Sequence, residues 1–168
     1  MHLDGLSDTA DAFLSGKPKD EMLAIMRDPH IGVMGVISII SVLLLKIGLL
    51  AAVAAPLKAT SLLLMCVLSR WSSVLAMFLF SYARKDGKAK VFMLGMNLKI
   101  FLFSLIAVFV FAFTIWRMKG LITLLIVAGC AYLIGKLANR KIKGITGDTL
   151  GAVIELTEII VLFTVCIS

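Results

Sequence analysis

The sequence predicts an all-α fold, a polytopic bundle of about five transmembrane helices. Hydrophobic residues make up 61% of the 168 residues, whereas soluble domains contain roughly 45–50% apolar residues. The mean hydropathy is +1.06. The apolar residues fall into five runs of about 18 to 24 residues, close to the roughly 20 that a helix needs to cross the hydrocarbon layer. We expect a single membrane domain, with a polar, acidic region over residues 1–31 and the bundle over 32–168.

Short polar connections separate the five runs and set their limits. The polar region contains the sequences Gly-Lys-Pro-Lys and Arg-Asp-Pro-His. Because glycine and proline interrupt helices, we expect a turn at each. Pro56 marks the first connection, and Arg117 with Lys119 marks a tight turn between the third and fourth runs. The expected runs are residues 32–55, 60–82, 98–116, 120–137 and 149–167.

The basic residues predict which way the bundle faces. Five crossings place 1–31, 84–99 and 136–148 on one side, with 12 of the 17 Lys and Arg residues; the other side has 3, and 2 lie inside runs. Cytoplasmic loops are enriched in Lys and Arg, so we expect the first side to be cytoplasmic. The net charge of +7 then reflects topology and contact with the lipid bilayer rather than nucleic acid. The 12 residues are Lys17, Lys19, Arg27, Arg84, Lys85, Lys88, Lys90, Lys99, Lys136, Arg140, Lys141 and Lys143.

A stripe of aspartates opens the chain. Asp4, Asp8 and Asp11 stand at i, i+4 and i+7, which is one face of a helix. Three carboxylates on one face repel each other unless a cation binds, and Mg²⁺ takes one or two carboxylates together with substrate phosphates. The pattern predicts a metal site; the alternative is a solvated acidic first turn. His2 is a candidate general base or an exposed bystander.

A second motif, GITGDTLGAVIELTE, covers residues 144–158. Thr146 or Asp148 can cap a helix whose N-terminal N–H groups, with Gly147, bind phosphate. Asp148 falls on the same membrane face as the stripe, because four runs separate them. Glu155 lies inside a run, where carboxylates are expensive and are functional candidates. The alternative is a capped helix whose glutamates pair with basic residues of a neighbouring helix.

Basic side chains supply the candidate phosphate ligands. Arg27 in the Arg-Asp-Pro-His step and Arg84 in the basic loop suit bidentate contacts with phosphate. Arg70 lies near the middle of a run, where it either pairs with Glu155 or holds a phosphate. Lys46 is expected to snorkel outward.

Five motifs together resemble the cobalamin synthase family, the adenosylcobinamide-GDP ribazoletransferases. The resemblance implies an integral membrane enzyme of a bacterial or archaeal cytoplasmic (inner) membrane, with its active site facing the cytoplasm. It would join adenosylcobinamide-GDP to α-ribazole or its 5′-phosphate and release GMP, with Mg²⁺ as cofactor, late in adenosylcobalamin biosynthesis. A homo-oligomer is one possible state of the protein, and the sequence does not decide it. The motifs are HLDGLSDTADAF at 2–13, RDPHIGVMGV at 27–36, SRW at 69–71, SYARKDG at 81–87 and GITGDTLGAVIELTE at 144–158.

The resemblance also implies residue roles. Asp4, Asp8, Asp11 and Asp148 would hold the metal against the GDP diphosphate, and Glu155 would complete the site. Asp8, Asp148 and His2 are the catalytic candidates. The phosphate-binding candidates are Arg27, Arg70, Arg84, Thr146, Gly147 and Glu155.

The resemblance raises one expectation about the N-terminal end. Family members usually carry membrane-spanning sequence ahead of the HLDG motif, which here begins at His2. We therefore expect residues 1–15 to be frayed or poorly ordered in this chain alone, and its transferase activity to be low or absent.

Other functions stay open at this stage. Another Mg²⁺-dependent membrane transferase with an Asp-rich motif is one, of the CDP-alcohol phosphotransferase or prenyltransferase kind. The chain lacks the DGxxAR and NDxxDxxxD motifs of those families. A transporter is the non-enzymatic alternative, but it requires inward polar residues in several runs, and the third and fourth runs have almost none.

Overall fold

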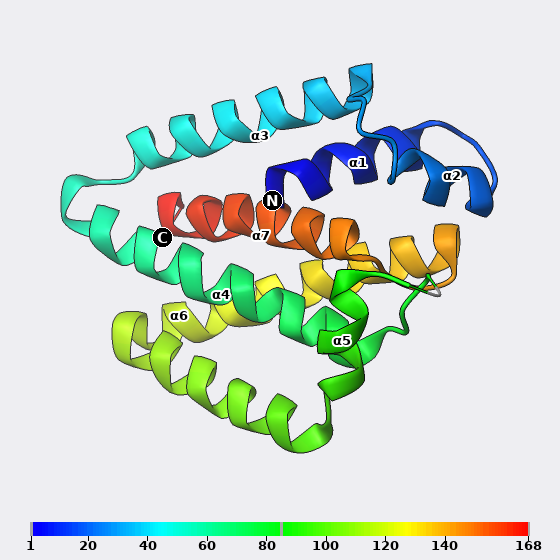
Figure 1. Ribbon diagram of the computed structural model, residues 1–168. Coiled ribbons are helices and arrows are strands. Elements are labelled where there is room, and N and C mark those ends of the chain that lie inside the picture. The colour runs from blue at the N-terminus through cyan, green and yellow to red at the C-terminus, as the bar shows by residue number, and fades with distance from the viewer. Residues whose placement is uncertain (1, 85, 168) are drawn as a thin grey trace.

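Long helices lie roughly alongside one another and shorter ones gather at one end of the bundle (Figure 1). The computed structural model describes residues 2–84 and 86–167, so the expectation for Lys85 lies outside the described residues. A short 3₁₀ turn, η1 (Ala55–Leu57), precedes α4. The helices are α1 (His2–Leu14), α2 (Lys19–Ile25), α3 (Val33–Ala52), α4 (Lys58–Leu79), α5 (Lys88–Gly95), α6 (Leu98–Ile142) and α7 (Gly147–Cys166).

Four of these helical stretches are long and apolar enough to cross a membrane: α3, η1 with α4, α6 and α7. Many large apolar side chains on α3 and α6 point outward, as in a protein whose surroundings are lipid. The prediction of a helical membrane bundle is confirmed.

The helix α6 is a hairpin rather than one straight rod. Trp116 and Arg117 leave helical geometry, and Arg117 has φ 51°. The arms, residues 98–115 and 118–142, run back along each other (Figure 1), and Val108, Ala112 and Val127 join one core cluster. The two arms match the third and fourth predicted runs, so α3, α4, the two arms of α6 and α7 are five long apolar helical segments within the described residues.

The close turn of this hairpin depends on Gly120. A Cβ at this position would lie 2.1 Å from the carbonyl oxygen of Ala112, so any side chain must push the arms apart. We expect Gly120→Ala to lower the free energy of unfolding by about 1–3 kcal/mol, the usual cost of overpacking. Gly129→Ala is the matched control, because a Cβ there meets nothing within 4 Å. Unfolding in sodium dodecyl sulfate mixed micelles measures both, and equal stability of the two variants would contradict the tight-hairpin interpretation.

The helix α7 lies in the middle of the bundle, between α1 and α3 on one side and α4 and α6 on the other (Figure 1). Its side chains are the most enclosed: Val153 is 1% exposed, and Thr157 and Val161 are 0% exposed. The hydroxyl groups of Thr157 and Ser72 of α4 lie 3.0 Å apart. This helix therefore fixes the frame from which Asp148 projects.

The first helix corrects an expectation. Residues 2–14 form a regular helix rather than a poorly ordered segment, because tertiary packing replaces what a short helix lacks alone. A Cβ at Gly5 would lie 2.7 Å from the carbonyl oxygen of Asp148, and one at Gly151 would lie 3.0 Å from that of His2. Leu6 and Ala12 are buried on the same helix. Glycines thus let α1 lie directly against α7.

Candidate functional site

The aspartate stripe faces a cavity at the end of the bundle where α1, α2 and the start of α3 meet. Asp4, Ser7 and Asp8 line this acidic cavity, which has a volume of about 260 Å³. The segment 27–31 closes it from the other side. The hydroxyl of Ser7 is buried without a hydrogen-bond partner among the described residues. The cavity therefore offers the carboxylates of Asp4 and Asp8 and one unused hydroxyl from α1, and the carboxylate of Asp28 from the opposite side.

Electrostatics confirm that the acids crowd each other. Burial and the charges of Asp4, Asp148 and Asp11 raise the pKa of Asp8 to about 6, while Arg84 opposes the rise. Aspartates of both predicted motifs thus act on the side chain of Asp8, which agrees with their expected location on the same side of the membrane. A bound cation would relieve the repulsion.

Asp11 has a different environment from the other two acids of the stripe. Its Oδ2 accepts a hydrogen bond from the backbone N–H of Gly32 at 2.8 Å, and its Oδ1 accepts one from Gly35 at 2.8 Å. These N–H groups belong to the start of α3, so Asp11 caps that helix from another part of the chain. A Cβ at Gly35 would lie 2.4 Å from Oδ2 of Asp11. The carboxylate ties α1 to α3.

We expect Asp11→Asn to weaken this tie more than it weakens metal binding. An amide accepts at one atom only and carries no charge, so the variant should lose about 1–2 kcal/mol of stability. Thermal unfolding measures this loss, and Mn²⁺ titration followed by electron paramagnetic resonance measures ion affinity without turnover. Asp4→Asn is the matched comparison within the stripe. Unchanged stability with a large loss of Mn²⁺ affinity would instead assign Asp11 to the metal.

The second motif reaches the site through a short strap, in which residues 81–83 pair with residues 144–145. Ala83 N–H donates to the carbonyl of Ile145 at 2.9 Å, and Ile145 N–H donates to Ser81 at 2.9 Å. Gly144, with φ 153°, permits the approach, because a Cβ there would lie 2.5 Å from the carbonyl oxygen of Ser81. The strap brings Arg84 to the start of α7.

The start of α7 is capped by Thr146, one of the two predicted alternatives. Its Oγ1 accepts from the backbone N–H of Thr149 at 3.2 Å, and the Thr149 hydroxyl accepts from the backbone N–H of Thr146 at 2.8 Å. Thr146 is 0% exposed, so its hydroxyl serves the cap. Gly147, the first residue of the helix, is exposed.

Asp148 and Arg84 form an ion pair at this point. Nη2 of Arg84 lies 3.0 Å from Oδ2 of Asp148. The N–H is not aimed at that oxygen, and Nε and Nη2 are buried without a hydrogen-bonded partner among the described residues. Buried donors of a cation are costly to leave unused. The guanidinium of Arg84 thus has hydrogen-bonding capacity left for an anion.

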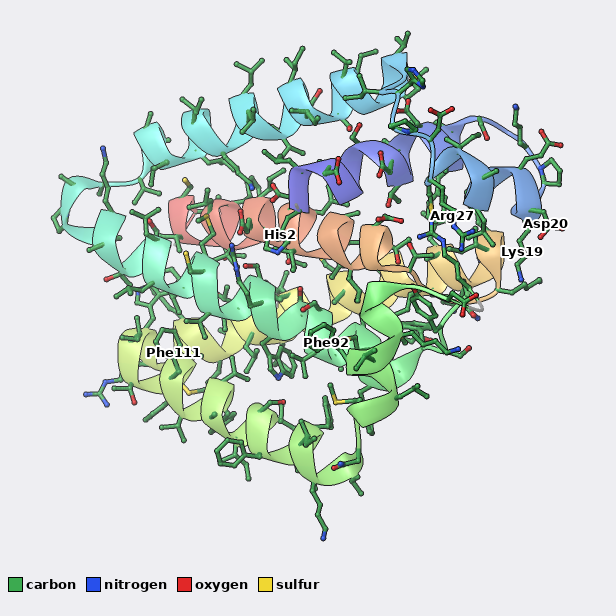
Figure 2. All side chains as sticks on the ribbon, viewed as in Figure 1. His2, Lys19, Asp20, Arg27, Phe92 and Phe111 are labelled. Carbon is green, nitrogen blue, oxygen red and sulfur yellow. The ribbon has the colours of Figure 1, made fainter. Side chains whose placement is uncertain are left out.

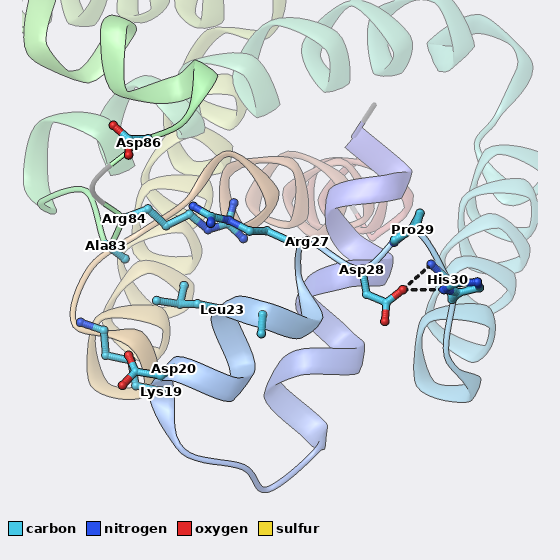
Figure 3. A pocket seen from close by; sticks show the side chains of 11 residues that line it. Lys19, Asp20, Leu23, Arg27, Asp28, Pro29, His30, Ala83, Arg84 and Asp86 are labelled. Atoms are coloured by element: carbon cyan, nitrogen blue, oxygen red, sulfur yellow. Dashed lines mark hydrogen bonds and ion pairs between the residues drawn. The ribbon is translucent and has the colours of Figure 1, made fainter.

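A second cavity, lined by basic and acidic side chains in equal number, adjoins the acidic one. Its volume is about 870 Å³; Lys19, Arg27 and Arg84 supply positive charge, and Asp20 and Asp86 are among the acids that line it. Figure 3 shows the side chains of Arg27 and Arg84 reaching toward one another across it. Asp28 and His30 also line it, and Nδ1 of His30 lies 2.6 Å from Oδ1 of Asp28. The residues 27–30 line both cavities.

The donor set fits Mg²⁺ bound together with a phosphate ligand. Within 2–84 and 86–167, no group of three or more His, Cys, Asp or Glu side chains could hold an ion by itself. The four predicted aspartates therefore do not form a preassembled four-ligand site. Asp4 and Asp8 line one cavity, and one or two carboxylates with substrate oxygens is the usual mode of Mg²⁺.

Seven predicted site residues line neither cavity: Asp11, Thr146, Gly147 and Asp148, described above, and His2, Arg70 and Glu155. His2 lies toward the middle of the bundle beside Gly151, whereas Lys19 and Arg27 lie at its end (Figure 2). Arg70 and Glu155 belong to an intramembrane cluster of charges. The geometry does not bring the side chains of His2, Arg70 and Glu155 to either cavity.

The intramembrane cluster corrects two interpretations. Nζ of Lys46 lies 2.5 Å from Oε2 of Glu155 and 2.5 Å from Oε2 of Glu158, so this lysine does not snorkel outward. Arg70 pairs with Glu158 rather than with Glu155. Two cations and two carboxylates thus neutralise each other across α3, α4 and α7.

Sequence reasoning missed two of the groups described above. Ser7 stands three residues after Asp4, so the helical spacing of the stripe could have included it. Lys46 pairs with residues more than a hundred positions away, and no local signal points to such a contact.

The fold and the site define a helical membrane protein whose carboxylates and arginines share one end of the bundle, an arrangement suited to phosphate chemistry. The chain belongs to the cobalamin-5-phosphate synthase family (CobS), whose family model matches residues 1–166.

Named relatives agree with this family. The adenosylcobinamide-GDP ribazoletransferase of Roseiflexus sp. (strain RS-1) is 38% identical over 168 residues, with 100% of this chain and 62% of the relative covered. The protein of the same name from Shigella flexneri serotype 5b (strain 8401) is 37% identical over 167 residues, with 96% of this chain and 67% of the relative covered. The chain thus spans about two thirds of the length of these relatives. No solved structure matches it.

Proposed function

We propose that the chain joins adenosylcobinamide-GDP to α-ribazole, or to its 5′-phosphate, and releases GMP. The observation that carries the proposal is the pair of adjoining cavities: Asp4 and Asp8 line one, Arg84 lines the other, and Arg27 lines both. A diphosphate donor needs charge neutralisation along its whole length, which this pairing offers. Membership of the family and the names of the relatives support the choice of substrates.

The chemistry is a displacement at phosphorus. An acceptor hydroxyl oxygen forms a bond to the phosphorus that carries cobinamide, the bond from that phosphorus to the oxygen of GMP breaks, and the hydroxyl loses its proton. Mg²⁺ supplies neutralisation of the diphosphate charge when bound. Such transfer relies on positioning and electrostatics rather than on a protein nucleophile.

We assign the residues as follows. Asp4 and Asp8 hold the metal, and Arg27 and Arg84 bind the phosphate that departs with GMP. Asp148 fixes Arg84 through their ion pair and adds negative charge beside Asp8. Asp4 and Asp8 lie on α1, Arg27 follows α2, Arg84 follows the strap, and Asp148 lies in the first turn of α7.

We also propose that the site faces the cytoplasm of a bacterial or archaeal cell, from its cytoplasmic membrane. The connections at this end of the bundle carry most of the Lys and Arg residues of the chain, which favours the cytoplasmic side.

The test is GMP release from adenosylcobinamide-GDP by the purified chain in liposomes, with and without α-ribazole. We expect release that requires both acceptor and Mg²⁺. Thermal stabilisation by adenosylcobinamide-GDP, with and without Mg²⁺, is the second readout, because it reports donor binding even where turnover is slow.

Two outcomes would contradict the proposal. GMP release at the same rate without acceptor would indicate a hydrolase. Absence of both release and Mg²⁺-dependent stabilisation would show that this site does not bind the donor.

A further inference from the structure

The helix α5 presents an apolar face that no other part of the described chain covers. Val91 is 73% exposed, Phe92 71% and Leu94 76%. The opposite face carries Ala89 and Met93, which pack against the core cluster at this end of the bundle. One apolar face of α5 therefore packs against the protein, and the other needs an apolar environment that the described chain does not supply.

The position of α5 identifies that environment. Figure 1 shows α5 lying across the direction of the long helices, at the end of the bundle where α4 stops and α6 starts. Only Met96 and Asn97 separate α5 from α6, and three residue steps span at most about 11 Å. Because α6 enters the hydrocarbon, α5 is held at the boundary between lipid and water.

The charges around α5 favour an anionic surface. The stretch 85–99 contains Lys85, Lys88, Lys90 and Lys99, against the single acid Asp86. Exposed apolar side chains flanked by lysines are typical of helices that lie in the headgroup layer, where each basic residue gains from anionic lipid.

We infer that α5 is an in-plane anchor that binds anionic phospholipid headgroups, with Val91, Phe92 and Leu94 inserted among the acyl chains. The anchor lies beside the start of α7, because a Cβ at Gly147 would lie 3.5 Å from the Cβ of Ala89. Lipid binding by α5 would therefore act close to the start of α7. This inference does not depend on the proposed substrates.

Spin labelling of the full chain in liposomes tests the anchor. The free cysteines Cys66, Cys130 and Cys166 are changed to alanine, and one cysteine is introduced by Leu94→Cys. The matched control is Lys17→Cys, on the exposed connection between α1 and α2. Collision with oxygen, which partitions into lipid, is compared with collision with a water-soluble nickel chelate. We expect the Leu94 label to favour oxygen and the Lys17 label to favour the chelate.

Lipid composition tests the charge preference. In phosphatidylcholine mixed with phosphatidylglycerol, Lys99→Gln should lower the ratio of embedded to water-exposed Leu94 label roughly fivefold. In phosphatidylcholine alone, the substitution should change the ratio little. Equal access of the chelate to both labels would overturn the anchor, as would dipolar broadening between Leu94 labels, which would indicate a second copy on this face. Insensitivity to phosphatidylglycerol would overturn the anionic preference.

Discussion

Asp8→Asn should reduce GMP release at least about a hundredfold and leave the fold and membrane insertion intact. Asparagine keeps the size of the side chain and removes the charge on which Asp4, Asp148 and Asp11 act unfavourably. The protein loses a carboxylate of the acidic cavity, and the donor loses part of its metal-mediated hold. The measurements are GMP release and Mg²⁺-dependent stabilisation by adenosylcobinamide-GDP.

Glu21→Gln is the matched control for the loss of one acid. Glu21 lies on α2, 3.4 Å from Lys17, with a side chain 57% exposed, so its removal should change neither readout. Release by Asp8→Asn within a few-fold of the parent at saturating Mg²⁺ would show that this carboxylate takes no part in metal binding.

The bundle could be predicted from the sequence because hydropathy acts residue by residue. A run of apolar residues of the right length has few options other than a spanning helix. The tight turn at Arg117 was also visible, since two cations and a glycine interrupt an apolar stretch. The order of the first helix was not, because it depends on Gly5 and Gly151 meeting partners from the opposite end of the chain.

The site was predictable in part for a similar reason. The spacing of Asp4 and Asp8 places them on one face of a helix, and an even number of crossings places Asp148 on the same side of the membrane. In the structure the charge of Asp148 acts on Asp8. The spacing cannot show that Asp11 turns to the start of α3, because Gly32 and Gly35 supply free N–H groups only after the chain folds.

The charges inside the membrane show the limit of such reasoning. The sequence indicates that Arg70 and Glu155 each need a partner, and a pair between these two residues was one of the alternatives. In the folded chain, Arg70 forms an ion pair with Glu158, and Lys46 forms ion pairs with both Glu155 and Glu158. The choice depends on the relative rotation of three helices, which no local spacing specifies.

Lys46→Met should lower the free energy of unfolding by about 3–5 kcal/mol, the usual result of removing one partner from a buried ion pair. Lys46 is the one cation in salt-bridge contact with Glu155 among the described residues, and the Glu155 side chain is 7% exposed. Its carboxylate would be left buried without a counter-ion, while Glu158 would keep Arg70. Unfolding in sodium dodecyl sulfate mixed micelles measures the loss.

The double variant Lys46→Met with Glu155→Leu separates charge balance from other roles of these residues. It removes one cation and one carboxylate together and leaves the pair of Arg70 and Glu158 intact. Since replacing a whole buried pair by apolar residues is often neutral, we expect stability to return to within about 1 kcal/mol of the parent. Donor binding should return with it, because Lys46 and Glu155 line neither cavity. A double variant as unstable as Lys46→Met would show that the lysine stabilises the bundle through something other than its pairing with Glu155. A stable double variant that no longer binds the donor would place this pair in the substrate site.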